Sequence, residues 1–356
     1  MFQEFLEKHQ LTGKKIAVGV SGGSDSLGLV LMIQEELAPL GYEIAALTVN
    51  HGLRPKAKEE ALYVADVMRR FKIFHQILNW EGKKPETGVE EAARKARYAL
   101  LLNWCRQNGF DYLVTAHHLL DEAETFLMRL ERGSGLDGLC GMKEVSEQNG
   151  IKILRPLLTA HPQKLKTYLK NKQINWVEDE SNACMDLLRV RIRSFLPEFE
   201  AKTGISALKI VQTMMRLQNS RTYFEDKIQS LIENNLKCWV GQAYCAPIEF
   251  FTALHPELLF RLLSTLLQKT GQNIYPPEAE KVLALAGKIK QPNFKAATLG
   301  HCRILLHQGV LWLVPEKVPN GSYSAKMWQA YLKEHPAIKK YAIPATVKRL
   351  LVLKTD

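Results

Sequence analysis

The sequence predicts an α/β fold built on a doubly wound parallel sheet, followed by a mainly helical second domain. Residues 14 to about 130 alternate short apolar segments with amphipathic helical segments, a pattern typical of parallel strands covered by helices. A Ser/Gly-rich turn joins the first apolar segment directly to a helical one, as at a ligand-binding strand end. From about residue 159 the pattern becomes mainly helical. The length of 356 residues fits two or three domains.

Short runs of apolar and β-branched residues predict the strands of the first domain, at residues 15–20, 43–49, 73–78 and 112–116. Helices are predicted between them, notably over 56–71 and 89–107. In the second of these, Ala92, Ala96 and Trp104 recur at helical spacing and are expected to face a core. Because ligands of such sheets bind at the carboxyl ends of the strands, polar motifs that follow a strand are the candidate site.

The second part of the chain is predicted to be a bundle of helices that ends in a hairpin. A helical pattern covers residues 205–236, more helices follow between 250 and 290, and Gln308 and Gly309 separate two apolar runs as a hairpin turn does. We therefore divide the chain into a catalytic domain (1–200), a mainly helical domain with a terminal hairpin (201–318), and a docked basic tail (319–356) that is too short for its own core.

The composition indicates a globular protein with an anionic partner. Hydrophobic residues make up 46% and charged residues 24%, and the formal net charge of +11 favours nucleic acid, although charge for solubility is the alternative. The six cysteines contain no C-x-x-C pair, which argues against zinc, iron–sulfur and disulfide frameworks. Without a signal-like start or a run of about 18 apolar residues, we expect a cytoplasmic protein with no membrane segment.

The turn SGGSDS, at residues 21–26, follows the first predicted strand and opens a helix. Its glycines allow close approach of the backbone, and free N–H groups at a helix N-terminus favour an anion. The serines add donors, whereas the Asp25 carboxylate suits a magnesium ion. We predict a phosphate site here; an ordinary turn with Asp25 or Ser26 as helix N-cap is the alternative. The turn is neither a Walker A loop nor G-x-G-x-x-G.

The segment TAHHLLDEAET, at residues 115–125, follows the fourth predicted strand and continues into a helix. Asp121 and Glu124 are one helical turn apart, so both carboxylates face one cleft, where a metal ion or a cationic substrate would separate them from phosphates. His117 could contact phosphates or carry a proton, although a lone histidine is more often structural. The glycine-rich run at 132–141 indicates a mobile lid or a close approach of backbone to a ligand.

Three further motifs are ambiguous on local grounds. NHGLR (50–54) follows the second strand, where the adenine and ribose side of a nucleotide pocket is expected, and a plain loop is the alternative. EEAARKARY (90–98) places Arg94, Arg97 and Tyr98 on one helix face, as a solvated helix also could. EDESN (178–182) precedes RVRIR (189–193), whose alternate arginines would spread around a helix to embrace a bulky anion or simply to meet solvent.

These motifs resemble those of the tRNA(Ile)-lysidine synthetases, a family of N-type ATP pyrophosphatases with an adenine nucleotide alpha hydrolase-like fold. SGGSDS alone resembles the pyrophosphate loop of the whole superfamily, and its combination with NHGLR, EEAARKARY, AHHLLDEAET, RLERGSGLDGLCGM and EDESN plus RVRIR selects this family. The resemblance covers about the first 200 residues and continues weakly over TLGHCR (298–303). Two positions depart from the family pattern: Leu120 replaces an Asp, and Val190 replaces an Asn.

The resemblance implies a carbon–nitrogen ligase of tRNA modification. ATP would adenylate the C2 oxygen of the wobble cytidine in the CAU anticodon of tRNA(Ile), releasing pyrophosphate, and the ε-amine of free L-lysine would displace AMP to give lysidine and change the codon read from AUG to AUA. The implied catalytic residues are Asp25, His117, Asp121, Glu124 and Arg191. The implied ATP contacts are Ser21, Gly22, Gly23, Ser24, Asp25, Ser26, Asn50, Arg97 and His117, with Mg²⁺ near Asp25. The implied lysine or tRNA contacts are Asp121, Glu124, Arg132, Asp137, Arg189 and Arg193.

Other function classes remain as alternatives. A related tRNA thiolase would need cysteine pairs, and this chain has none. A basic RNA-binding protein with a vestigial nucleotide site need not keep His117, Asp121, Glu124 and Arg191. An amidotransferase-coupled synthetase would show a glutaminase nucleophile elbow, which is not found. The oligomeric state is open, with a homodimer as one alternative.

Overall fold

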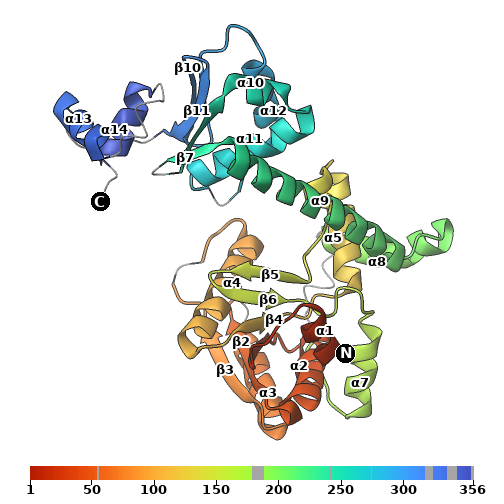
Figure 1. Ribbon diagram of the computed structural model, residues 1–356. Helices are drawn as coiled ribbons and strands as arrows, with labels where there is room; N and C mark the ends of the chain where they lie inside the picture. Colours follow the sequence, from red (N-terminus) through yellow and green to blue (C-terminus); the bar gives the residue numbers. More distant parts are fainter. Residues whose placement is uncertain are drawn as a thin grey trace. The chain divides into compact units, whose positions relative to one another are not determined.

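The computed structural model describes residues 1–53, 56–82, 84–178, 188–239, 242–273, 275–316, 324–334 and 343–353. The chain forms two compact units, Met1–Asn219 and Ser220–Asp356, so the predicted boundary at residue 200 lies inside the first unit. Figure 1 shows a sheet flanked by helices in the first unit and a smaller sheet with helices in the second. None of the helices in the described part of the chain is long and apolar enough to span a membrane.

The sheet of the first unit has six strands in the order β3-β2-β1-β4-β6-β5. All neighbours are parallel except β5 and β6, which form an antiparallel edge. The four predicted strands are confirmed, and the hairpin of β5 and β6 was not predicted. The strands are β1 (Lys15–Gly19), β2 (Glu43–Asn50), β3 (Phe74–Asn79), β4 (Tyr112–Val114), β5 (Val145–Gln148) and β6 (Ile151–Leu154).

Helices cover both faces of this sheet. Successive residues of a strand point to opposite faces, so each face has a core of its own. Ile16 and Val18 of β1 pack into the core under α1, α2, α3 and α7, whereas Ala17 packs into a second core under α4. The helices are α1 (Phe2–Lys8), α2 (Ser24–Leu37), α3 (Ala57–Arg70), α4 (Val89–Asn108), α5 (Leu119–Glu131), α6 (Leu136–Leu139), α7 (Gln163–Asn171) and α8 (Leu188–Thr203), with a 3₁₀ turn at Ala38–Leu40. The doubly wound α/β fold is therefore confirmed.

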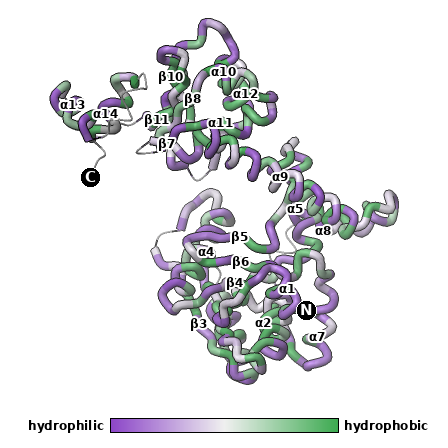
Figure 2. Tube along the Cα trace, viewed as in Figure 1, coloured by the Kyte–Doolittle hydropathy of each residue, from purple (hydrophilic) through white to green (hydrophobic). Residues whose placement is uncertain are grey.

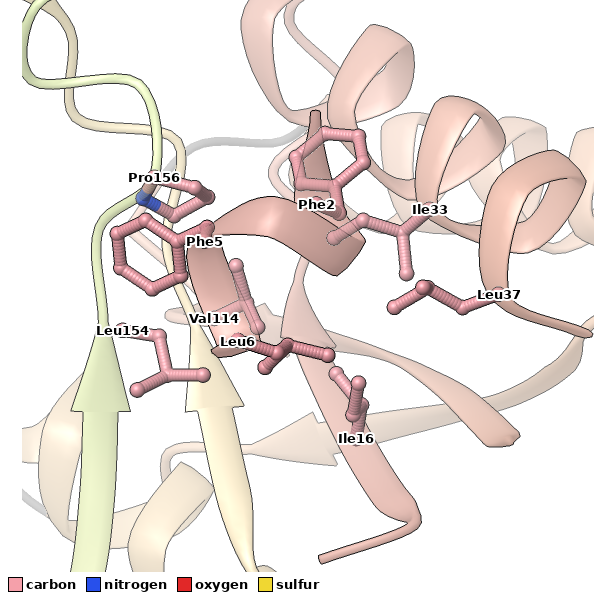
Figure 3. Close-up of a pocket in the computed structure, with 9 residues that line it drawn as sticks. All are labelled: Phe2, Phe5, Leu6, Ile16, Ile33, Leu37, Val114, Leu154 and Pro156. Atoms are coloured by element: carbon pink, nitrogen blue, oxygen red, sulfur yellow. The ribbon is translucent and has the colours of Figure 1, made fainter. Parts of the chain in front are cut away.

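An apolar pocket lies beneath α1, on the face of the sheet that carries α2. Figure 3 shows the aromatic rings of Phe2 and Phe5 on one side and the aliphatic side chains of the sheet and α2 on the other. Every lining residue is apolar, so the pocket has no group to orient a charged ligand. We therefore assign it to the packing of α1 and look for the functional site elsewhere.

The strand order reverses between β1 and β4, since the chain runs from β1 outward to β2 and β3 and then returns to β4 on the other side. A doubly wound sheet has a crevice at this position, outside the carboxyl ends of the two strands. The segment after β1 is SGGSDS, and the segment after β4 opens α5. The topology thus brings the two strongest sequence motifs to the same edge of the sheet.

The second unit contains the predicted helices and more sheet than the sequence indicated. It begins within α9 (Ala207–Asn235) and includes α10 (Ile248–Ala253), α11 (Pro256–Thr270), α12 (Ala279–Ile289), α13 (Ala325–Glu334) and α14 (Ala345–Leu353). An antiparallel sheet has the order β7-β8-β11-β10-β9. Its strands are β7 (Lys237–Trp239), β8 (Ala243–Pro247), β9 (Ala296–Leu299), β10 (Cys302–His307) and β11 (Val310–Pro315).

The predicted hairpin is confirmed as β10 and β11, which pair from Cys302–Pro315 to His307–Val310. Gln308 and Gly309 in its turn have φ of +49° and +75°, as the two central residues of a type I′ turn require. The other three strands were not predicted.

The C-terminal helices pack on the second sheet. Trp328, Tyr331 and Val347 are buried in one cluster with Trp312 of β11 and Cys245 of β8. The rings of Trp328 and Tyr331 stack with their centroids 5.7 Å apart. The described part of the C-terminal segment therefore contributes to the core of this unit.

Candidate active site

The SGGSDS turn forms a rigid loop over the N-terminus of α2. Ser26 Oγ accepts a hydrogen bond from the Ser21 N–H (3.1 Å) and donates to the Gly23 carbonyl (3.2 Å). Gly23 is the N-cap of α2 and provides no side-chain cap, so the first N–H groups of the helix are available to an anion. This geometry is suited to the binding of a phosphate.

Both the backbone conformation and the limited room for a side chain require a glycine at position 22. Its φ is +91°, and a Cβ there would come within 3.2 Å of Val64 and 3.3 Å of Val177. The Gly22 carbonyl also accepts the Val177 N–H at 2.9 Å, which ties the loop to the segment after α7. The loop is thus held from both sides before any ligand binds.

Asp25, in the first turn of α2, faces the first turn of α5 across the crevice. Its Oδ2 lies 3.5 Å from His118 Nε2, and the Nδ1 of the same ring accepts the Asp121 N–H at 3.4 Å. The Asp121 carboxylate returns a bond by accepting the His118 N–H at 3.0 Å, which completes a capping box. Burial alone would lower the pKa of His118, but Asp25, Asp121 and Glu124 outweigh it and raise this pKa. His118 therefore links the two loops at the topological switch point.

Asp121 and Glu124 lie on the same side of α5, as their spacing predicts, and two arginines of α8 pair with them. Arg189 donates to Asp121 Oδ1 at 3.0 Å and to Glu124 Oε2 at 2.7 Å. Arg193 donates to Glu124 Oε1 at 2.5 Å and to Oε2 at 3.1 Å. Glu124 has no exposed surface, so this pairing compensates a fully buried charge. Its hydrogen bonds with Glu124 raise the pKa of Arg193.

His117 lies among cations. Burial and, to a smaller extent, the charges of Arg155, Arg97, Arg94 and Arg189 together lower its pKa to about 3. Its Nδ1 is 2.9 Å from Thr115 Oγ1. The ring is therefore neutral at physiological pH and can donate a hydrogen bond from Nε2, whereas it is a weak proton acceptor. Several arginines around a neutral histidine make an electropositive region suited to phosphates.

Hydrogen bonds with side chains of α5 and α9 hold the end of the glycine-rich segment. Glu122 Oε2 accepts the Met142 N–H at 3.0 Å, and Gln218 Nε2 donates to the carbonyls of Cys140 (2.6 Å) and Met142 (2.8 Å). A Cβ at Gly141, whose φ is +68°, would overlap the Glu122 carboxylate. The close approach of backbone at Gly141 is to the Glu122 side chain, whereas the prediction was an approach to a ligand.

The remaining predicted residues lie outside this cluster or play a local part. Asn50 bonds to Asn79 (3.2 Å) and to the Gly52 N–H (3.0 Å), which shapes the turn after β2. Arg132, Asp137 and Arg191 are exposed. Arg54 of NHGLR and residues 179–182 of EDESN lie outside the described residues.

Three site residues were not singled out by sequence reasoning: His118, Glu122 and Arg155. His118 adjoins His117, and its place directly before the helix was the only local signal. Glu122 and Arg155 are buried, with exposed fractions of 2% and 8%. Their partners Met142, Lys143 and Ser146 are distant in sequence, so no short pattern reveals them.

Asp25 fits a magnesium ion better than any other described residue of the crevice. Its Oδ1 is buried and has no hydrogen-bond partner, whereas Asp121 and Glu124 are paired with arginines. Among the described residues no group of three or more His, Cys, Asp or Glu side chains is arranged to hold a metal ion. Magnesium commonly binds one or two carboxylates together with substrate phosphates, and Asp25 beside a phosphate loop meets that requirement.

Comparison with known proteins agrees with this arrangement. Residues 1–199 match the PP-loop domain family. A tRNA(Ile)-lysidine synthase of Hyphomonas neptunium is 34% identical over 317 residues, covering 87% of this chain and 84% of that protein. One from Wolbachia sp. subsp. Brugia malayi is 33% identical over 318 residues, covering 85% and 71%. The chain belongs to the tRNA(Ile)-lysidine synthase family. The family resemblance inferred from the motifs is therefore confirmed.

A solved structure shares the fold of the catalytic part of this lysidine synthase family member. The U34-tRNA thiolase NcsA from Methanococcus maripaludis, with its [4Fe-4S] cluster, aligns with a TM-score of 0.50 and 20% identity, covering 57% of this chain and 71% of that one. At this identity the likeness concerns the fold alone.

Proposed function

We propose that the chain ligates lysine to carbon 2 of the wobble cytidine in the CAU anticodon of tRNA(Ile), with ATP as co-substrate. The observation that carries this proposal is the meeting of the SGGSDS loop and α5 at the switch point, where His118 links Asp25 to Asp121. Relatives named tRNA(Ile)-lysidine synthase align over most of the chain and support the choice of substrate. The five described free cysteines are in keeping with a cytoplasmic location.

In the first step the cytidine C2 oxygen attacks the α-phosphorus of ATP, and the bond to the β-phosphate breaks to release pyrophosphate. The loop amides and the hydroxyls of residues 21–26 bind the leaving pyrophosphate. The neutral His117 donates a hydrogen bond, and Arg97 and Arg155 stabilise the negative charge that develops.

Asp25 would hold a magnesium ion through its unpartnered Oδ1 and the phosphate oxygens. The bound ion supplies neutralisation of phosphate charge. His118 lies against Asp25 Oδ2, which leaves Oδ1 as the oxygen of this carboxylate without a hydrogen-bond partner.

In the second step the ε-amine nitrogen of lysine attacks C2, the C2–O bond breaks, and AMP leaves while the amine loses a proton. Asp121 and Glu124 are the carboxylates available to bind a cationic amino acid beside the phosphates. Because Arg189 and Arg193 pair with both, lysine must share or replace these guanidinium contacts.

The proposal is tested by incubating the protein with a tRNA(Ile) transcript, ATP, Mg²⁺ and lysine, and analysing the wobble nucleoside by mass spectrometry. We expect a cytidine that has gained lysine with loss of water, formed only when ATP is present. An unmodified cytidine under these conditions, with a folded protein, would refute the proposed function.

Asp25→Asn should abolish pyrophosphate release, because a neutral amide cannot hold the cation that offsets phosphate charge. Asp66→Asn is the matched control, since Asp66 lies on the surface of α3 in a local pair with Arg69. Near-normal pyrophosphate release by the Asp25 variant would show that this loop is not the reacting site.

A further inference from the structure

The helix α8 presents two different faces. On one, Arg189 and Arg193 bind the α5 carboxylates, and Leu196 is buried against α5 and α9. Arg191, Phe195 and Lys202 are spaced i, i+4 and i+11, which places them together on the opposite side, and all three are exposed. Hydrophobic and hydrophilic residues alternate along this helix in Figure 2. The exposed side therefore combines one aromatic ring with two cationic side chains and one carboxylate, Glu198.

Phe195 is the unusual member of this face. It keeps 48% of its surface exposed, whereas its neighbour Phe199 is half-buried in the apolar cluster of α5, α8 and α9. The two rings are tilted by 45° with centroids 5.8 Å apart, so Phe195 is held by Phe199 along one side only. A phenylalanine on a charged face leaves about half of its apolar area without a partner in the unit.

We propose that Phe195 is a stacking platform for an unpaired base of the RNA substrate. The inference rests on the proposed function and identifies a contact of the same site. Phe195 lies six residues beyond Arg189, about 9 Å along the helix axis, and on the other side of a helix that is about 10–12 Å across with its side chains. A bound strand would therefore have to pass around α8 to contact both the ring and the carboxylate cluster.

Charge supports a nucleic acid as the occupant. Arg191 is one turn from Phe195, and the described residues provide no ion pair for it. Lys202 is paired with Glu198 at 2.7 Å, but both groups are exposed, so water and a phosphate can compete for the ammonium. Unpaired RNA bases are commonly bound by an aromatic ring that stacks on the base while cations contact the backbone. The formal charge of +11 favours such an anion over a second copy of this chain.

The test measures the Kd of a CAU-anticodon stem–loop RNA for the full-length chain. Phe195→Ala should raise Kd about 5- to 150-fold, which corresponds to about 1–3 kcal/mol at 1.4 kcal/mol per tenfold. Phe195→Tyr should bind the RNA with wild-type affinity because it keeps an aromatic ring. Phe195→Leu is apolar but has no ring, so its Kd should rise as in Phe195→Ala. Leu208→Ala, on α9, removes an exposed apolar side chain of similar exposure (46%) and should leave Kd unchanged.

The salt dependence separates stacking from charge. The slope of log Kd against log salt should be unchanged in Phe195→Ala, since no charge is lost, and should flatten by about one in Arg191→Ala. Melting curves establish that each variant is folded; if Phe195→Ala does not fold, the comparison of the Tyr and Leu variants decides.

Several results would overturn the inference: unchanged affinity in Phe195→Ala, wild-type affinity in Phe195→Leu, or a change from dimer to monomer in sedimentation. The last would assign the ring to contact between copies of the chain. Failure of the wild-type chain to form lysidine would refute the proposed function itself, and that result is obtained independently of the Kd series.

Discussion

Glu122→Gln offers a quantitative test of how the glycine-rich segment is held. Glu122 is 2% exposed, its Oε2 accepts the Met142 N–H at 3.0 Å, and its Oε1 is buried without a hydrogen-bond partner. Burial raises the pKa of this carboxyl from 4.5 to about 7, although the Met142 bond and the charges of Arg129 and Arg155 oppose the shift. The native protein therefore keeps a proton on Glu122 at pH values where the unfolded chain has lost it.

The sign follows from linkage between proton binding and folding. Between pH 4.5 and about 7 the native state binds more protons than the unfolded state, so the free energy of unfolding falls as pH rises. At 1.36 kcal/mol per pH unit, the loss is about 3 kcal/mol and is complete above pH 7. A glutamine keeps an acceptor for Met142 and has no charge to bury. The variant should therefore match the wild type near pH 4 and exceed it by up to about 3 kcal/mol at pH 8.

Urea unfolding of both proteins across this pH range gives the difference directly. Glu131→Gln, an exposed position at the end of the same helix α5, is the control and should show no pH-dependent difference. A difference between Glu122→Gln and wild type that is the same at pH 4.5 and pH 8 would refute the argument that Glu122 is a buried, protonated carboxyl.

Four further predictions concern Glu124, Asp121, Gly141 and the C-terminal segment. Glu124→Gln should lower the free energy of unfolding by about 1–3 kcal/mol, because the buried carboxylate loses its charge-assisted bonds to Arg189 and Arg193, whereas these guanidinium groups are partly exposed and keep Asp121 as a partner. Asp121→Asn should chiefly raise the lysine concentration needed in single-turnover assays, and unchanged lysine dependence in both variants would place the amine elsewhere. Gly141→Ala should lower Tm, since a Cβ meets the Glu122 carboxylate at a positive φ and costs at least about 1 kcal/mol. Truncation after Pro315 should lower Tm, because it removes the aromatic side chains of α13 from their cluster with Trp312. It should also flatten the salt dependence of tRNA binding, because the basic charges of the tail are lost. An unchanged slope of log Kd against log salt would limit the tail to a packing role.

The strands β1, β2 and β4 could be predicted because each is a short run of mostly buried, β-branched or apolar residues, and β3 because of the apolar Phe74, Ile77 and Leu78, although none of its residues is buried. Of the missed strands, β6 and β8 are also mostly buried, whereas β5 and β7 lack this signal. β5 is the polar edge sequence VSEQ, and β7 is only three residues long, so both form because a neighbouring strand offers hydrogen bonds. The same reasoning explains why the hairpin of β10 and β11 was predicted, since its turn residues and alternating strands are local.

Part of the site could be predicted because its motifs are local in sequence and follow strand ends. The SGGSDS loop and the α5 motif follow strand ends, and the rule for doubly wound sheets places them together. The sequence could not predict that Arg189 and Arg193 would pair with Asp121 and Glu124, because more than 60 residues separate the partners. Helical spacing predicted correctly that the two carboxylates share a face, but it carries no information about which cation meets them.

The pairing changes how the carboxylates can act. Glu124 accepts three guanidinium hydrogen bonds and has no exposed surface, so a lysine ammonium gains little by adding a fourth partner to a group that is already satisfied. Asp121 is 14% exposed, and Arg189 is its main cation. The charge of Arg189 contributes to the lowered pKa of His117, so this guanidinium lies close enough to act on that ring. Phosphates bound among the arginines near His117 would therefore compete with Asp121 and Glu124 for Arg189. Bound ATP would then weaken the Arg189–Asp121 pair, which makes Asp121 the more accessible of the two carboxylates for a cationic substrate.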